Sequence, residues 1–548
     1  LTVTMTRPAS IMAGPSAADP CTTTLTAGAD IQAAINSASP GDVICLEPGT
    51  YSPSSMISID KSVTLQGPQA GVDPRPSACT TRTPGDVTTE AIIEGATSGL
   101  VKIIDIVAND VVIDGLEVKS GTGDMINQSS AWTCTVAKYN IIHDGRGDEG
   151  VQLRKCTSCF LEYNYVYDIA APGDGLNISN GSVNGMIRFN ELHDIGSENA
   201  AIYVYYSTNT TIQCNLVYDV PNDDAITLGY KGGSDAQEKG GSIRYNVLHD
   251  LAEDGITVYM SDTVVEGNEI YHSNSENGAI YLYFGISNID IVDNYLHDNN
   301  LKTNKRPKAA AIMVAGDVNA GTVRVNNNNI EGNTPYGVTN VASDQLDATG
   351  NWWGATDGPS GENTGSGDAV SSNVDFSSYL TSPAEPQGDN PCVGHLTIVK
   401  EADPADGTDF PFLLQSSCAD DAFTLDDADP DDGDAFSDSK TFARQPGAYV
   451  VTELVPDGWN LDDIVCTSEL PNGTGGFSVD LHNAWAEIDL TLGEHVVCTY
   501  TNSKAAPVGG TTMPSNLIGA WLPLTGLAAL LVLGATAALL RRGKTAPK

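Results

Sequence analysis

The chain has 548 residues, enough for several domains, and a formal net charge of -43. A surface this acidic repels nucleic acid and anionic lipid, so we expect no nucleic-acid partner. The acidity is compatible with calcium, with secretion or with a salty exterior, and does not choose among them. The 55 glycines and 11 cysteines favour turns and strands over long helices.

Residues 1–20 have no clear basic and apolar regions, so we interpret them as the remnant of a signal peptide or as a disordered segment. A short helix is predicted next, because Asp30 is a good N-cap and Pro40 ends the apolar periodicity. Such a helix would cover the open end of a stacked sheet. Cys21 and Cys45 flank it, and extracellular cysteines at such positions are candidates for a disulfide.

Residues 41–380 are repetitive. An Asn, an apolar residue, a His or Tyr and an Asp return before each short alternating strand, as in YNVLHDLAEDGITVY at 245–259. The repeated asparagines, 22 to 34 residues apart, are Asn140, Asn164, Asn190, Asn215, Asn246, Asn268, Asn294 and Asn328. Strands at this interval with no room for crossover helices wind into a parallel β-helix, each coil adding about 4.8 Å.

Equivalent residues of successive coils are then stacked. The asparagines are predicted to form an inward ladder of side-chain amides. A second column is predicted from His143, Tyr167, His193, Tyr218, His249, Tyr271 and His297. Four of the chain's 8 histidines belong to this column, so ring stacking is favoured over a metal site.

Residues 21–380 resemble the right-handed parallel β-helix proteins of the pectate-lyase-like superfamily, and NWWGATDGPSGENTGSGDAV at 351–370 is similar to the closing segment of many bacterial surface β-helix proteins. That superfamily includes polysaccharide lyases, glycosidases and adhesins, so the fold leaves the function open. The fold class expected for the whole chain is all-β: this β-helix, then a small β-sandwich, then a C-terminal transmembrane or sorting helix.

Acidic residues gather just before several strands, and Asp223, Asp224 and Asp254 are the catalytic candidates. Carboxylates on neighbouring coils have the separations that glycosidases use, but any acidic column would pass this test, and a calcium site or a solvated turn is an equal alternative. Of the polygalacturonase motifs, only the Asp-Asp pair in PNDDAITLG is present. A lyase would need a basic residue, for which Arg154 and Lys231 are the candidates, and the basic insert 301–310 could reach an anionic glycan.

The outward positions of the same strands are rich in aromatic and polar residues. Aromatic faces beside hydroxyl and amide groups suit sugar rings. The predicted polysaccharide-binding residues are Tyr203, Tyr205, Tyr259, Tyr281, Tyr283, Asn177 and Asp174. The alternative is a tyrosine-rich strand surface without a ligand, or a contact surface covered by a loop.

After a linker at 381–393, residues 394–504 resemble the prealbumin-like (SpaA-like) sandwich domains that act as stalks of surface proteins. Cys466 and Cys498 are placed for a disulfide. Some relatives carry a Lys–Asn isopeptide bond, for which Lys400 and Asn502 are candidates, although no catalytic Glu is evident. Asp427, Asp429 and Asp431 are dense enough for calcium, but the following Gly is late for an EF-hand, and an acidic hairpin is the alternative.

A second linker, 505–516, precedes residues 517–548, in which an apolar run long enough to span a bilayer is followed by basic residues. The run contains an LPxTG-like box, which resembles the sorting signal that sortase cleaves between Thr and Gly: Leu522, Pro523, Thr525 and Gly526. Apolar residues also precede the box, so a plain membrane anchor is the alternative. In both cases we expect an extracellular protein that is held at the cell surface. One hypothesis is that it binds polysaccharide and also cleaves it. The alternative is a non-catalytic adhesin or envelope component. Calcium is the one cofactor that the sequence suggests, and the oligomeric state stays open.

Overall fold

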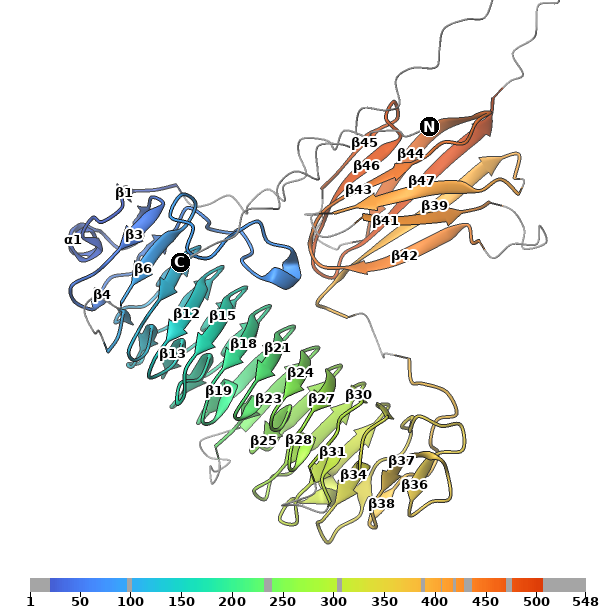
Figure 1. The fold of residues 1–548 in the computed structure, drawn as a ribbon, viewed down its shortest axis with the longest axis horizontal. Helices are drawn as coiled ribbons and strands as arrows, with labels where there is room; N and C mark the ends of the chain where they lie inside the picture. The colour runs from blue at the N-terminus through green and yellow to red at the C-terminus, as the bar shows by residue number, and fades with distance from the viewer. Residues whose placement is uncertain are drawn as a thin grey trace, which may run out of the picture. The chain divides into compact units, whose positions relative to one another are not determined.

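The computed structural model describes residues 20–95, 101–230, 239–302, 308–385, 390–405, 407–416, 420–427, 436–469 and 476–505. Lys231, Asp429, Asp431, part of the basic insert and the LPxTG-like box lie outside these ranges. The described part forms a β-helix and a β-sandwich (Figure 1). Within it, no helix is long and apolar enough to cross a membrane.

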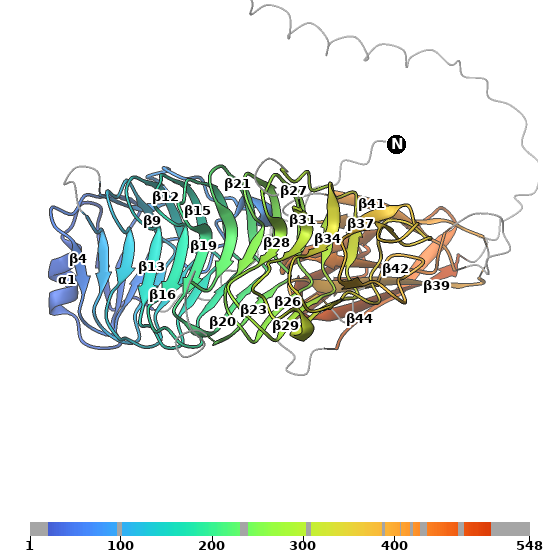
Figure 2. The ribbon, with the colours of Figure 1, turned by 90° about the horizontal axis from the view of Figure 1, so that it is seen from below.

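The β-helix is built from three parallel sheets that stack coil on coil (Figure 2). Sheet A consists of β1 (Thr23–Leu25), β2 (Val43–Leu46), β5 (Thr64–Gln66), β8 (Val112–Asp114), β11 (Val136–Lys138), β14 (Phe160–Glu162), β17 (Met186–Arg188), β20 (Thr208–Gln213), β23 (Lys239–Arg244), β26 (Thr263–Glu266), β29 (Ile289–Val292), β32 (Val323–Asn326), β35 (Leu346–Asp347) and β38 (Val374–Asp375). Sheet B consists of β3 (Gly49–Tyr51), β6 (Ala91–Glu94), β9 (Glu117–Lys119), β12 (Ile141–Gly145), β15 (Tyr165–Ile169), β18 (Glu191–Ile195), β21 (Leu216–Val220), β24 (Val247–Leu251), β27 (Glu269–Ser273), β30 (Tyr295–His297) and β33 (Asn329–Glu331). Sheet C consists of β4 (Ile57–Ile59), β7 (Ile104–Ile106), β10 (Ile126–Gln128), β13 (Val151–Arg154), β16 (Leu176–Ser179), β19 (Ala200–Tyr205), β22 (Asp224–Leu228), β25 (Ile256–Val258), β28 (Gly278–Leu282), β31 (Ala310–Val314), β34 (Tyr336–Asn340), β37 (Gly367–Val370) and β36 (Pro359–Gly361).

The predicted helix is present as α1 (Ile31–Ser37), and Asp30 caps it by accepting a bond from Ala33 N at 3.1 Å. Its Gln32 side chain pairs with both backbone groups of Ser58 in β4, at 2.7 and 3.0 Å. The helix therefore covers the first strand of sheet C and satisfies an edge that would otherwise be open. Two short 3₁₀ turns, Pro76–Ala78 and Ala320–Thr322, complete the helical segments of the described part.

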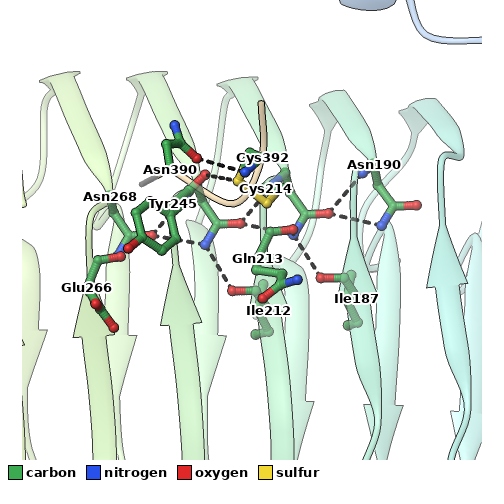
Figure 3. The surroundings of a disulfide bond; sticks show 12 residues. Ile187, Asn190, Ile212, Gln213, Cys214, Tyr245, Glu266, Asn268, Asn390 and Cys392 are labelled. Atoms are coloured by element: carbon green, nitrogen blue, oxygen red, sulfur yellow. Dashed lines mark hydrogen bonds between the residues drawn. A yellow bond between two sulfur atoms is a disulfide. The ribbon is translucent and has the colours of Figure 1, made fainter. Parts of the chain in front are cut away.

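The asparagine ladder is confirmed. Each Nδ2 from Asn140 onward donates to the Oδ1 of the equivalent asparagine one coil later, at 2.9 to 3.1 Å. Asn351, which follows Asn328 in the same way at 3.0 Å, extends the ladder by one coil. The amides also donate to backbone carbonyls, as Asn215 Nδ2 does to Ile187 O at 3.0 Å (Figure 3).

The predicted ring column is also confirmed. Its neighbouring His and Tyr rings are stacked with centroids 4.8 to 5.3 Å apart from His143 to His297. Inward residues of sheet C such as Ile202, Val204 and Ile226 are fully buried, as their alternation predicts.

The β-sandwich packs two sheets around its own apolar core. One sheet contains β42 (Ser439–Arg444), β39 (Gly394–Asp403), β47 (His495–Lys504) and β44 (Trp459–Ser468). The other contains β41 (Asp420–Leu425), β40 (Phe410–Gln415), β43 (Gly447–Glu453), β46 (Trp485–Leu490) and β45 (Gly476–Asp480).

Both predicted disulfides, Cys21–Cys45 and Cys466–Cys498, are present. A further disulfide that the sequence did not indicate joins Cys214 to Cys392 (Figure 3). Cys214 occupies the turn position that the aromatic rings of Tyr163 and Phe189 fill in the preceding coils. The bond therefore fastens the segment before β39 to the side of the β-helix.

Candidate functional site on sheet C

The register of sheet C places a column of carboxylates at the start of its strands. Ile126, Val151 and Leu176 pair in sequence, as do Ile202, Ile226 and Ile256. The residues two positions before these strand residues therefore align coil by coil: Asp124, Glu149, Asp174, Ala200, Asp224 and Asp254. Ala200 divides the column, since it carries no polar group.

Asp254 is surrounded by donors. Thr257 Oγ1 and Asn277 Nδ2 donate to its Oδ2 at 3.0 and 3.1 Å. Ser275 Oγ and the Gly278 backbone N donate to its Oδ1. A carboxylate held by four donors is a rigid structural element, so we assign Asp254 a positioning role.

Asp174 is held in the same way. Ser197 Oγ donates to its Oδ1 at 2.6 Å, and Asn177 Nδ2 donates to its Oδ2 at 3.0 Å. Desolvation by burial raises the pKa of Asp174 to about 6 against these bonds. The Ser-Glu-Asn sequences at 197–199 and 275–277 each supply the clamp for the carboxylate of the preceding coil.

Asp223 and Asp224 lie between these two clamped groups. Asp224 is buried, accepts from Thr227 Oγ1 at 2.8 Å, and binds the Asp254 backbone N at 3.1 Å. Burial and the charge of Asp254 raise the pKa of Asp224 well above its ordinary value. Asp223 is only half-buried, and desolvation, with Asp254 and Glu253 nearby, raises its pKa to about 7.

A second group of carboxylates, Asp124, Asp148 and Glu149, lies farther along the column and has few donors. Their oxygens lie within 4.8 Å of one another. Among the described residues, Asp124 Oδ1 and Glu149 Oε2 are buried without a hydrogen-bond partner. Burial and the neighbouring carboxyls raise the pKa of Glu149 to about 10.

Amide oxygens lie beside this second group. Gln152 Nε2 donates to Glu149 Oε1 at 2.6 Å, while Gln152 Oε1 is buried and has no partner among the described residues. Asn127 pairs with Gln152 across the strands, and its Oδ1 is likewise buried without a hydrogen-bond partner among the described residues. Unpaired carboxylate and amide oxygens are the donor set that calcium prefers.

Arg154, a candidate basic residue for a lyase reaction, does not lie beside Asp223. It lies three strands away in sheet C, roughly 14 Å along the axis. It lines a cavity of about 810 Å³ together with Lys155, Asn180 and Tyr206. This cavity gives the acidic chain a local cationic surface, on the same coil as Glu149.

The predicted sugar-binding tyrosines fall into two classes. Tyr203 and Tyr281 point outward but are only 7% and 3% exposed. Their rings are covered by Tyr205 and Tyr283, whose centroids lie 4.6 and 5.4 Å away. The half-buried outer rings, and Tyr259 with them, therefore form the accessible aromatic surface.

Sequence reasoning missed three further aromatic residues of this surface. Tyr206 and Tyr230 pack together at 4.9 Å, and Phe284 lies 4.3 Å from Tyr283. Gly229 lies between Tyr205 and Tyr259 in the register and has a φ of 101°, which favours glycine. The Tyr-Tyr pair at 205–206 was the available sequence signal.

The β-sandwich contains a separate buried group. Lys400 Nζ donates to Asn502 Oδ1 at 2.8 Å and lies 3.9 Å from Glu453 Oε1. All three residues are at most 2% exposed. Desolvation lowers the pKa of Lys400 to about 8 and raises that of Glu453 to about 7. Glu453 is the acid that sequence reasoning did not find; its signal was an inward position in the alternation of Tyr449 and Val451.

Asp427 is the described member of the predicted calcium triad in this domain. Its Oδ2 accepts a bond from the backbone N of Ala402. The calcium site proposed there from the sequence stays a prediction, since Asp429 and Asp431 lie outside the described residues.

Comparisons with known proteins match the two folded parts. Residues 122–294 and 197–352 match the family described as "Right handed beta helix region", and residues 396–504 match "Prealbumin-like fold domain". No curated protein sequence matches the chain.

Solved structures with a similar fold include the mannuronan C-5 epimerase AlgE6 A-module of Azotobacter vinelandii, with 16% identity, a TM-score of 0.44, and coverage of 66% of this chain and 97% of that one. Pectate lyase Pel9A has 12% identity and a TM-score of 0.40, over 56% and 80% of the two chains. An alginate lyase from Paenibacillus sp. str. FPU-7 has 18% identity and a TM-score of 0.38, over 55% and 100%. Likenesses of this size carry no argument about the chemistry of this chain.

Proposed function

We propose that this chain is a surface-held extracellular protein that binds polysaccharide along the outward face of sheet C and cleaves it with Asp223 as the proton-transferring group. The observation that carries the proposal is the state of Asp223. It is half-buried, and its pKa is raised to about 7 beside the buried Asp224. A carboxyl that titrates near neutral pH is suited to general acid–base catalysis.

The surroundings of Asp223 support a glycan as the substrate. Burial, together with the charges of nearby Asp224, Asp254 and Asp223, raises the pKa of Tyr259, so its hydroxyl stays protonated. Together with Tyr205 and Tyr283 it offers ring faces against which the C–H face of a sugar can pack. Asp254 and Asp174 keep this edge of the sheet rigid.

We propose calcium as the cofactor of the same face, held by Asp124, Asp148 and Glu149. Their unpaired oxygens fit the ion, as do those of the adjacent amides. When bound there, calcium supplies positive charge that attracts an anionic glycan. Arg154 and Lys155 bind carboxylate groups of the same polymer from the neighbouring cavity.

We also propose that the chain is held at the cell surface by residues 517–548, through sortase or as a membrane anchor, with the β-sandwich as the stalk. The sequence of the box at Leu522 to Gly526 is the support for this part of the proposal.

Incubation of the chain with a panel of polysaccharides, with calcium or with a chelator, tests the activity. We expect new reducing ends, and absorbance from unsaturated uronate if the reaction is an elimination. Asp223→Asn should lower the rate by about 100-fold or more. Asp219→Asn, an exposed change of the same charge in the same coil, should leave it unchanged. Retention of a glycan without turnover would instead identify a binding module, and full activity of D223N would exclude the acid–base assignment.

A second proposal concerns the stalk: Lys400 and Asn502 form an isopeptide bond, assisted by Glu453. The neutral Lys400 amine attacks the Asn502 side-chain carbonyl, an amide bond forms, and one ammonia leaves, with Glu453 transferring the proton. The 2.8 Å contact and the matched pKa values of Lys400 and Glu453 support this step. Intact mass should be lower by one ammonia in the wild type and in Asp489→Asn but not in Glu453→Gln; an unchanged mass in the wild type would refute the proposal.

A further inference from the structure

Three cysteines of the described part carry free thiols: Cys134, Cys156 and Cys159. Cys156 and Cys159 are fully buried in the core of the β-helix, whereas Cys134 is exposed. The remaining cysteines that the structure describes are disulfide-bonded. A chain that oxidises its other cysteines and leaves a Cys-x-x-C pair reduced calls for a chemical reason.

The three thiols belong to one turn and its neighbour. Cys156 and Cys159 enclose the turn between β13 and β14, where Ser158 has a left-handed φ of 56°. Cys134 lies in the preceding coil, and its backbone N donates to Thr157 O, between the two buried cysteines, at 3.0 Å. The Cys159 thiol is a hydrogen-bonding neighbour of the Cys156 sulfur.

Neighbouring coils show that this turn does not require sulfur. The pairing of Thr157 with Val183 aligns Cys156 with Ser182, whose hydroxyl bonds to the turn backbone. The pairing of Phe160 with Val136 and Met186 aligns Cys159 with Thr135 and Gly185. Small residues of other kinds thus form the same turn one coil away in either direction.

We propose that Cys156 and Cys159 are a thiol–disulfide exchange site, with Cys134 as the entry thiol and a small external disulfide as the oxidant. The Cys134 thiolate attacks one sulfur of that disulfide, forms a mixed disulfide and releases one thiolate. Cys159 then displaces the second thiolate to give Cys134–Cys159. Cys156 attacks the Cys159 sulfur, which forms Cys156–Cys159 and frees Cys134. Two protein thiols lose two electrons, and the two released thiolates take up the two protons.

The electrostatics of the pair agree with the last step, in which Cys156 attacks the Cys159 sulfur. The hydrogen bond from Cys159, with further bonds from Thr135 and Gln128, lowers the pKa of Cys156 despite its burial. Burial raises the pKa of Cys159. The low-pKa thiol is the better nucleophile of a Cys-x-x-C pair.

Oxidised glutathione is the probe for the test. The folded full chain is incubated with it, quenched with acid, alkylated and mapped by mass spectrometry. We expect a Cys156–Cys159 disulfide with Cys134 alkylated, reversed by excess reduced glutathione. Cys134→Ser should slow formation by about tenfold. Cys159→Ser should accumulate glutathione on Cys134.

Three alkylated thiols after oxidation of the folded wild type would overturn the exchange site. An unchanged rate in C134S would overturn the role of Cys134. Both variants place serine where neighbouring coils tolerate small or hydroxyl residues, and equal thermal midpoints would show that the fold is kept. If C159S does not fold, the rate comparison between the wild type and C134S decides.

Discussion

Two groups of carboxylates lie along the same edge of sheet C in opposite surroundings. Asp174 and Asp254 are each clamped by hydroxyl and amide donors from their own coil and from the following coil. Asp124 and Glu149 face each other and keep oxygens without a partner among the described residues. The same residue type at the same register position is therefore a structural acceptor in one group and a candidate cation ligand in the other. The difference arises from the donors that adjacent coils provide.

The largest expected effect comes from removing a clamped carboxylate. Asp254→Ala leaves the buried hydroxyls of Ser275 and Thr257 and the half-buried amide of Asn277 without an acceptor, so the free energy of unfolding should fall by about 3 kcal/mol. Denaturant unfolding in the presence of a chelator measures it. Asp124→Ala leaves no such donors without an acceptor, so it should lower the free energy of unfolding much less. Equal losses of stability in the two variants would contradict the distinction between the two carboxylate groups.

The next largest expected effect is stabilisation of the folded chain by calcium. At about a hundred times its Kd, the ion should stabilise the folded chain by about 2.7 kcal/mol. The gain should disappear in the double variant Asp124→Asn, Glu149→Gln and persist in Asp144→Asn, which changes a partly exposed carboxylate of β12. Thermal unfolding with and without calcium gives the comparison, and a gain retained by the double variant would place the ion elsewhere.

The smallest effect is a pH dependence of the calcium-free protein. The pKa of Glu149 is raised from 4.5 to about 10 in the folded state, so the folded state binds the proton more tightly than the unfolded state. The contribution of Glu149 to stability is present below the unfolded pKa and is lost as pH rises toward the folded pKa. Glu149→Gln should reduce this fall by about 1 kcal/mol or more between about pH 5 and pH 9. Parallel pH profiles of variant and wild type would contradict the raised pKa.

Much of the β-helix was predictable because the strand register of a repeat protein follows from the spacing of its repeated residues. Asn190, Asn215 and Asn246 recur with the strand pattern, so their stacking follows from the coil rise alone. The same register gave the acidic column. It did not show which members are clamped, since Ser275 and Asn277 belong to the coil after Asp254 and act through side-chain geometry.

Other features were hidden for different physical reasons. Outward alternation suggested that Tyr203 and Tyr281 face solvent, whereas the orientation of the Tyr205 and Tyr283 rings buries them. Glu453 comes from the sheet opposite Lys400, a tertiary contact without a local pattern. The Cys214–Cys392 disulfide spans 178 residues, and the repeat pattern does not predict which cysteine pairs with Cys214.

Calorimetric titration of calcium into the chain, near neutral pH and in buffers of different ionisation enthalpy, tests the contrast between the two carboxylate groups most directly. Because Glu149 must lose a proton to bind the ion, we predict binding with proton release for the wild type and for Asp223→Asn. The release should be absent in Glu149→Gln. Binding without proton release, or identical titrations of wild type and E149Q, would contradict the account.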